Sequence, residues 1–150
     1  MKINFTKKEY RTLIKLIQIS DWVINSHRHR GDSAVENEAA VVQKIYSHAK
    51  EMECEDLIMY SKELGEFFET QYAEFDSEAR RYIEEYDEET FWAELIDRLS
   101  KRDVMSKTTE EEFLRMPQEE KIRLFCDAEE PWEKEVQEHG LKRIGIVTKN

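Results

Sequence analysis

Two pairs of acidic residues are spaced so that their side chains could act together. Glu63 and Glu66 are three positions apart, and so are Glu94 and Asp97. On a helix, residues three apart lie on one face, so each pair would present two carboxylates side by side. If the two helices faced each other, the four carboxylates could hold Mg²⁺, a cation that takes oxygen ligands.

The segment Lys62-Glu63-Leu64-Gly65-Glu66 resembles the first acidic helix of the all-α nucleoside-triphosphate pyrophosphohydrolases. The resemblance covers only the four acids of the two pairs, and no basic residues match positions for binding a triphosphate. It implies a metal-dependent all-α hydrolase of nucleotide-like substrates. Composition gives the competing interpretation. With 34 acids in 150 positions, chance alone places about eight acidic pairs at this spacing, which favours solvated helix faces.

The one dense basic run is His27-Arg28-His29-Arg30. It could contact an anion or a partner, with Trp22 one turn earlier to stack on a base. Alternatively, these cations complement the negative end of a helix and neutralise the acidic segment that follows. We favour the second interpretation and expect no nucleic-acid binding, because the rest of the chain is strongly negative.

The charge is distributed unevenly along the chain. Residues 1–30 carry +5, residues 31–100 carry −14 and residues 101–150 carry −2, which gives the total of −11. The acidic block keeps apolar residues every three to four positions, so it is expected to fold as helices with its acids pointing to solvent. A continuous negative face would then attract a basic protein partner.

The two cysteines stand alone, without a CxxC motif or a histidine at metal-ligand spacing. Two isolated cysteines are typical of free thiols in a reducing compartment. Cys54 lies among four acids, a negative field that should raise its pKa and suppress its reactivity. Cys126 follows the apolar Phe125 and is expected to be packed. The interrupted apolar stretch at residues 13–24 is too short and polar for a membrane span, so we expect a cytoplasmic protein without membrane contact.

Eight aromatic residues gather between positions 67 and 92. Aromatics at helical spacing most often form core, although such a set could also line a ligand pocket inside a helical bundle. The set is Phe67, Phe68, Tyr72, Phe75, Tyr82, Tyr86, Phe91 and Trp92.

Apolar periodicity predicts an all-α fold with five main helices, over residues 6–26, 34–52, 56–75, 76–86 and 87–102. Thr6 and Glu9 form a capping box for the first helix, and Asp87 is expected to cap the fifth. The first helix has two apolar stripes and should be central, with Leu13, Ile14, Ile17 and Val23 in the core.

The C-terminal third is expected to hold short elements. Thr109 should cap a turn over residues 110–115, and Pro117 and Pro131 should each begin a helix, the second ending before Gly140. Residues 141–147 resemble a short strand, whose expected partner is residues 3–5.

We therefore expect one all-α domain over residues 1–150, a helical bundle with a small terminal β element. Its helical body would comprise residues 1–104, with residues 105–150 as an appendage and a hinge near residues 101–109. A chain of 150 residues buries roughly 70% of its unfolded surface. The predicted function is that of a non-catalytic acidic cytosolic protein, an adaptor, regulator or immunity-type inhibitor that binds a basic partner without a cofactor. The alternative is the Mg²⁺-dependent hydrolase using Glu63, Glu66, Glu94 and Asp97.

Overall fold

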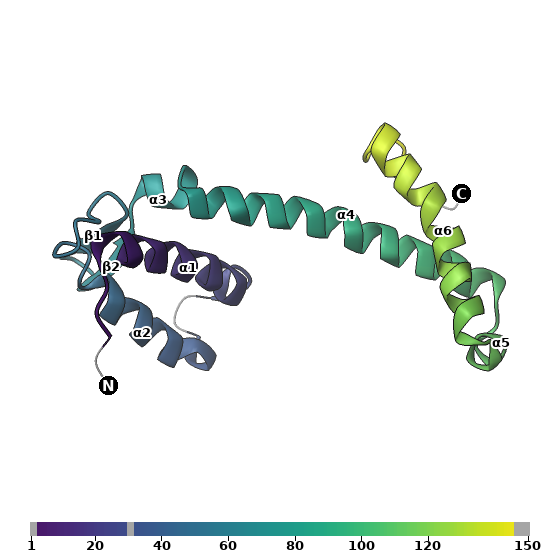
Figure 1. Cartoon of the computed structure of the whole chain (residues 1–150), viewed down its shortest axis with the longest axis horizontal. Helices are drawn as coiled ribbons and strands as arrows, with labels where there is room; N and C mark the ends of the chain where they lie inside the picture. The colour runs from purple at the N-terminus through teal and green to yellow at the C-terminus, as the bar shows by residue number, and fades with distance from the viewer. Residues whose placement is uncertain (1–2, 30–31, 146–150) are drawn as a thin grey trace. The chain divides into compact units, whose positions relative to one another are not determined.

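The computed structural model describes residues 3–29 and 32–145, and it is mostly helical with one two-stranded sheet (Figure 1). The chain divides into two compact units, Met1–Tyr86 (unit 1) and Asp87–Asn150 (unit 2). The boundary lies inside the long helix α4, Glu78–Lys107. No helix among the described residues combines the length and apolar character that crossing a membrane requires.

Unit 1 begins with α1, Lys7–Asn25, and the predicted capping box is confirmed. The Glu9 carboxylate accepts a hydrogen bond from the Thr6 backbone N–H over 2.8 Å, and the Thr6 hydroxyl accepts one from the Glu9 backbone N–H. Ile14 and Ile17 are buried, as predicted, and Leu13 packs partly buried against the core. The prediction is wrong for Val23, which is 59% exposed, because the second apolar stripe of α1 is left uncovered within the described part of unit 1.

A 3₁₀ helix η1, Ser33–Val35, leads into α2, Glu36–Tyr46. The predicted second helix was too long at its C-terminal end, since turns follow Tyr46 and Glu53 takes a positive φ of 56°. Asp32 caps η1 by accepting a hydrogen bond from the Ala34 N–H over 2.9 Å.

The predicted third helix over residues 56–75 is wrong. This segment forms an antiparallel hairpin of β1, Ile58–Ser61, and β2, Glu66–Glu69, followed by the short helix α3, Gln71–Phe75. Gly65 sits in the connecting turn with φ +71°, a left-handed conformation that costs other residues energy. The glycine that interrupted the helical pattern therefore marks a hairpin turn, and the helical apolar spacing arose from two strands and a short helix in succession.

The core of unit 1 joins these elements. Its buried cluster is Tyr10, Ile14, Ile17, Tyr46, Ala49, Cys54, Leu57, Ile58 and Ala73. The Tyr10 hydroxyl donates a 2.6 Å hydrogen bond to the Ile45 carbonyl, which ties α1 to α2. Lys15 of α1 pairs with Glu78 at the start of α4 over 2.8 Å.

The predicted helix start at Asp87 is also wrong, because residue 87 lies in the middle of α4. The helix begins instead after Ser77, whose hydroxyl accepts a hydrogen bond from the Arg80 N–H over 3.2 Å. The pair Arg80–Glu84, spaced i,i+4, supports the helix on the way to residue 87. Without a glycine or proline nearby, a cap-type residue alone does not end a helix.

Unit 2 contains the rest of α4, then α5, Glu110–Arg115, and α6, Gln118–His139. Thr109 forms the predicted cap, as a capping box with Glu112. Pro131 lies inside α6, so the two predicted helices are one, which ends at Gly140 as expected. Since α4 continues to Lys107, the predicted hinge falls mostly within a helix. The division at residue 104 stays a prediction.

Two side-chain hydrogen bonds connect α4 and α6 within the described part of unit 2. The Trp132 Nε1–H donates to Asp103 Oδ2 over 2.9 Å, and the buried Ser100 hydroxyl donates to the Ala128 carbonyl over 3.3 Å. The predicted terminal β element is not formed by the described residues, because residues 3–5 and 141–145 are not in a strand. Residues 146 and 147 of that prediction lie outside the described part of the chain.

Candidate functional site

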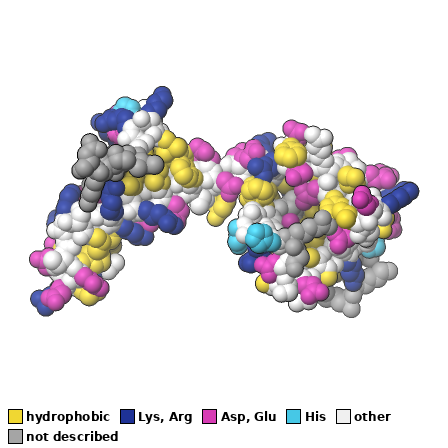
Figure 2. Space-filling view, turned by 180° about the vertical axis from the view of Figure 1, so that it is seen from behind, with side chains coloured by type: hydrophobic (Ala, Val, Ile, Leu, Met, Phe, Trp, Pro, Cys, Tyr) yellow, Lys and Arg dark blue, Asp and Glu magenta, His cyan; other side chains and the backbone are white. Residues whose placement is uncertain are grey.

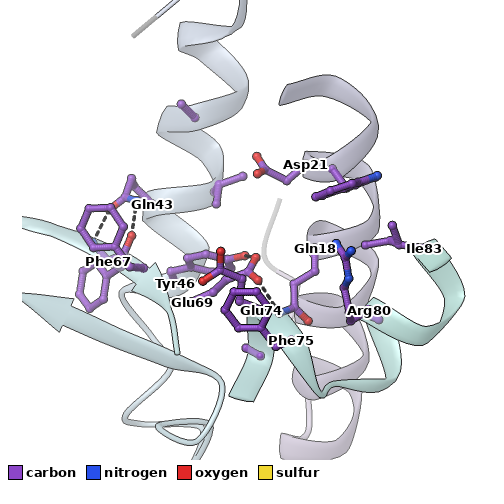
Figure 3. A pocket seen from close by; sticks show the side chains of 16 residues that line it. Gln18, Asp21, Gln43, Tyr46, Phe67, Glu69, Glu74, Phe75, Arg80 and Ile83 are labelled. Atoms are coloured by element: carbon purple, nitrogen blue, oxygen red, sulfur yellow. Dashed lines mark hydrogen bonds between the residues drawn. The ribbon is translucent and has the colours of Figure 1, made fainter. Parts of the chain in front are cut away.

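A cavity of about 580 Å³ opens in unit 1 between α1, α2, β2, α3 and the first turns of α4 (Figure 3). Its size falls in the range of small-molecule and side-chain binding pockets. The walls combine aromatic rings with three carboxylates, those of Asp21, Glu69 and Glu74. Because five elements contribute to it, the cavity exists only when unit 1 is folded.

Glu69, the last residue of β2, lies at the centre of this cavity (Figure 3). One carboxylate oxygen accepts a hydrogen bond from Gln18 Nε2 over 3.0 Å, and the other accepts one from the Tyr46 hydroxyl over 3.1 Å. Burial raises the pKa of the Glu69 carboxyl, and the negative charges of Asp21 and Glu74 add to the increase. The two hydrogen bonds act in the opposite direction, since they stabilise the charged form.

The three carboxylates of the cavity lie together beside apolar side chains and without a basic partner among the described residues. Within the described residues, none of the three forms an ion pair with a lysine, arginine or histidine, and Asp21 accepts only from the Asn25 side-chain amide, over 2.8 Å. By contrast, basic side chains neutralise acids elsewhere in the unit. These ion pairs are Lys7–Glu53, Arg11–Asp56, Lys15–Glu78, Arg28–Asp32, Arg80–Glu84 and Arg81–Glu85.

Aromatic side chains form the apolar part of the walls. Phe67 and Phe68 come from β2 and Phe75 from the end of α3. The side-chain amide of Gln43 fixes β2 to α2, because it donates to the Phe67 carbonyl and accepts from the Phe67 N–H, each over 2.8 Å. These two bonds satisfy backbone groups at a sheet edge and hold the phenylalanines in place.

Arg80 supplies the single basic side chain among the described cavity-lining residues. Its guanidinium carbon lies 4.6 Å from the centre of the Trp22 ring, and its Nε donates to Glu84 over 2.9 Å. A guanidinium on an aromatic face is a favourable cation–π arrangement. One wall of the cavity therefore already accommodates an arginine side chain.

The acid pairs singled out from the sequence are placed differently from the prediction. Glu63 lies in the hairpin turn and Glu66 on β2, so they do not share a helix face. Glu94 and Asp97 do lie on α4, where Glu94 pairs with Arg98 over 3.0 Å and Asp97 with Lys101 over 2.7 Å. In residues 3–29 and 32–145, no group of three or more His, Cys, Asp or Glu side chains is arranged to hold a metal ion.

The basic run follows the end of α1. Arg28 Nε donates to the Ile24 carbonyl over 2.7 Å, and Arg28 also pairs with Asp32 over 3.4 Å. Arg28 and His29 line a separate cavity of about 600 Å³, whereas His27 is simply exposed. Arg30 lies outside the described residues. The Arg28 contacts are those expected of a cation at a helix C-terminus.

The cysteine and aromatic predictions are corrected in part. Cys54 is buried, and burial is the main cause that raises the pKa of its thiol. Cys126 is exposed, so the prediction that it packs is wrong. Three rings of the aromatic set line the cavity, those of Phe67, Phe68 and Phe75. The interpretation of the set as core is wrong for five exposed rings, those of Tyr72, Phe75, Tyr82, Tyr86 and Phe91.

Sequence reasoning missed Glu69 as a site residue because it sat between apolar positions of a supposed helix. One signal could have identified it: a glutamate directly after two phenylalanines, in a segment bounded by Gly65 and Thr70, fits a strand whose last side chain turns inward. Gln18 and Asp21 gave no such signal.

No protein-family model, curated protein or solved structure matches this chain.

Proposed function

We propose that this protein is a non-catalytic binding protein that engages a basic protein partner through the acid-lined cavity of unit 1 (the cavity of Asp21, Glu69 and Glu74). One observation carries the proposal: three carboxylates line the same cavity and have no cationic partner among the described residues, although lysine and arginine side chains pair with six acids elsewhere in the unit. Uncompensated negative charge beside an apolar wall attracts a cation from outside.

The surface of unit 1 does not favour the expected continuous negative face. On the face seen in Figure 2, acidic side chains of unit 1 are interspersed with basic and apolar ones. Unit 1 carries twelve Lys/Arg against seventeen Asp/Glu. Several of these basic side chains, among them Lys7, Arg11 and Lys15, form ion pairs with acids. The recognition of a partner is therefore assigned to the cavity and its rim, and not to the whole surface.

The experiment is a calorimetric titration of the full chain with a short peptide of alternating basic residues and glycine. Binding should be clear at about 0.01 M salt and largely lost at about 1 M, because the screening length falls from about 30 Å to about 3 Å. A peptide of the same length with glutamate at every basic position should not bind.

Matched variants locate the interaction. The double variant Asp21→Asn/Glu74→Gln removes two charges at the cavity and should weaken binding strongly. The control Glu55→Gln/Asp76→Asn removes two charges from exposed residues that do not line the cavity, and it should bind almost as the natural sequence does. Equal loss in both variants, or binding that is insensitive to salt, contradicts the proposal.

A further inference from the structure

The cavity of unit 1 has features that select among cations, beyond attracting positive charge in general. Its volume is about 580 Å³, more than a single ion fills, and its walls include aromatic rings and aliphatic side chains. An occupant must therefore combine a positive charge with a planar or apolar body. The inference that follows rests on the proposed function, because it names the group of the partner that the cavity receives.

We propose that the cavity is a binding site for an arginine side chain of the partner, with its guanidinium on the Glu69 carboxylate and its stem between the aromatic walls. The Glu69 carboxylate uses one acceptor position on each oxygen for Gln18 and Tyr46. A carboxylate offers about four such positions, so the remaining two can receive a guanidinium through two parallel hydrogen bonds.

The guanidinium group fits this environment better than an ammonium group. It is planar, weakly hydrated and able to stack on rings, whereas the lysine ammonium is compact and strongly hydrated. Burying the occupant beside Phe67, Phe68 and Phe75 therefore costs less desolvation for arginine than for lysine.

The contact between Arg80 and Trp22 supplies an internal precedent. The Arg80 guanidinium already lies over the Trp22 ring at 4.6 Å, on the rim of the same cavity, and is held there by Glu84. Because Arg80 contacts Trp22 and Glu84, Glu69 has no cationic partner among the described residues. A second guanidinium would supply the charge that Glu69, Asp21 and Glu74 lack.

The test uses three peptides of identical sequence that carry arginine, lysine or citrulline at the same positions. Citrulline keeps the shape of arginine and removes its charge. Binding is followed by the fluorescence of Trp22 in a full chain with Trp92→Phe and Trp132→Phe, so that Trp22 is the remaining tryptophan. The arginine peptide should bind best, and the citrulline peptide at least about tenfold more weakly, as expected when a charge-assisted hydrogen bond is lost.

Two matched pairs of variants test the position of the bound group. Glu69→Gln should lower the affinity for the arginine peptide about tenfold. Glu63→Gln, in the exposed hairpin turn, should change this affinity by less than about twofold. Phe75→Ala should also weaken binding, whereas Tyr72→Ala, an exposed aromatic on the same helix α3 outside the cavity lining, should not. Phe75 is itself exposed, so this variant keeps the fold, which circular dichroism checks.

The outcomes separate the two proposals. If arginine and lysine peptides bind equally and Glu69→Gln behaves like Glu63→Gln, the basic-partner function stands and the arginine site is overturned. If no peptide binds but N-acetylarginine amide does, weakened by Glu69→Gln, the guanidinium site stands and the protein-partner function is overturned. If neither the peptides nor the amide bind, both are overturned.

Discussion

The Tyr46 hydroxyl donates a hydrogen bond to Glu69 over 3.1 Å, so a residue at the end of α2 positions the carboxylate at the end of β2. Tyr46 is almost fully buried. Burial raises the pKa of its hydroxyl strongly, and the negative charge of Glu69 adds to the increase. The hydroxyl therefore remains a donor at physiological pH, and the pair forms a fixed polar point beside the core.

The Tyr46→Phe variant should lose this hydrogen bond and little else, because the ring is kept. We expect the free energy of unfolding to fall by about 1–2 kcal/mol at neutral pH, where the acceptor is charged. Urea denaturation followed by Trp22 fluorescence in the Trp92→Phe/Trp132→Phe chain measures it. Since one hydrogen bond to the charged form is removed, the pKa of Glu69 should rise further, which an NMR titration of its side chain detects. An unchanged stability would contradict a net contribution of this hydrogen bond to the folded state.

Glu69 should make the stability of unit 1 depend on pH in a defined direction. Its pKa in the folded chain is raised above the ordinary 4.5, so the folded chain holds this proton more tightly than the unfolded chain. The resulting stabilisation is fully present below the ordinary pKa and is lost as the pH rises through the raised value. The free energy of unfolding, measured at about pH 4 and about pH 7, should therefore rise for Glu69→Gln relative to the natural sequence as the pH increases.

The difference between variant and natural sequence isolates Glu69 from other acids. Asp56 and Glu78, for example, have lowered pKa values because Arg11 and Lys15 donate to them, and they destabilise the fold as the pH falls. The same comparison for Glu63→Gln, which removes an exposed acid of the hairpin turn, is the control. Parallel stability curves for Glu69→Gln and the natural sequence would contradict the prediction.

Gly65 should be required for the backbone of the hairpin and not for space. A Cβ at this position would meet nothing within 4 Å, but φ is +71°. Gly65→Ala should therefore cost about 1–2 kcal/mol of unfolding free energy through backbone strain alone. Gly65→Asn should cost less, because asparagine tolerates this conformation. Equal loss in both variants would point to a side-chain clash instead, and thermal denaturation distinguishes the two results.

The two faces of α1 should respond differently to truncation. Ile14 is fully buried, so Ile14→Ala should cost about 2–5 kcal/mol, as other large-to-small core substitutions do. Ile17→Ala should fall in the same range. Val23→Ala and Leu16→Ala remove methyl groups from side chains that are 59% and 57% exposed, and each should change stability by less than about 0.5 kcal/mol. A large loss for Val23→Ala in urea denaturation would indicate that this stripe is covered in solution.

The two thiols should react at very different rates. Cys126 is exposed, whereas Cys54 is buried and has a raised thiol pKa; the thiolate is the reactive form. A thiol reagent should therefore label one cysteine of the folded protein quickly and the second only after denaturation. Cys126→Ser should abolish the fast phase, and Cys54→Ser should leave it intact. Two fast phases would contradict the burial of Cys54.

Local features of this protein could be predicted from the sequence. The capping box of Thr6–Glu9 and the cap at Thr109 lie where expected, because a cap is completed by residues about three positions apart. Gly140 ends α6 for a similarly local reason. The helical start at Ser77 and the buried positions Ile14 and Ile17 also follow from short-range spacing.

Other features were decided only by the tertiary structure. The hairpin at residues 58–69 replaced a helix because pairing between β1 and β2, and the hydrogen bonds of Gln43 to Phe67, satisfy the backbone with partners distant in sequence. Val23 is exposed because the other elements of unit 1 pack against the stripe of α1 that holds Ile14 and Ile17. The candidate site depends most on distance: Gln18 and Glu69 are 51 residues apart in the chain, and only packing of α1, α2 and β2 brings them together. The extent to which the Glu69 carboxylate is buried, and the side chains that surround it, depend on residues distant in the sequence, which no local pattern encodes.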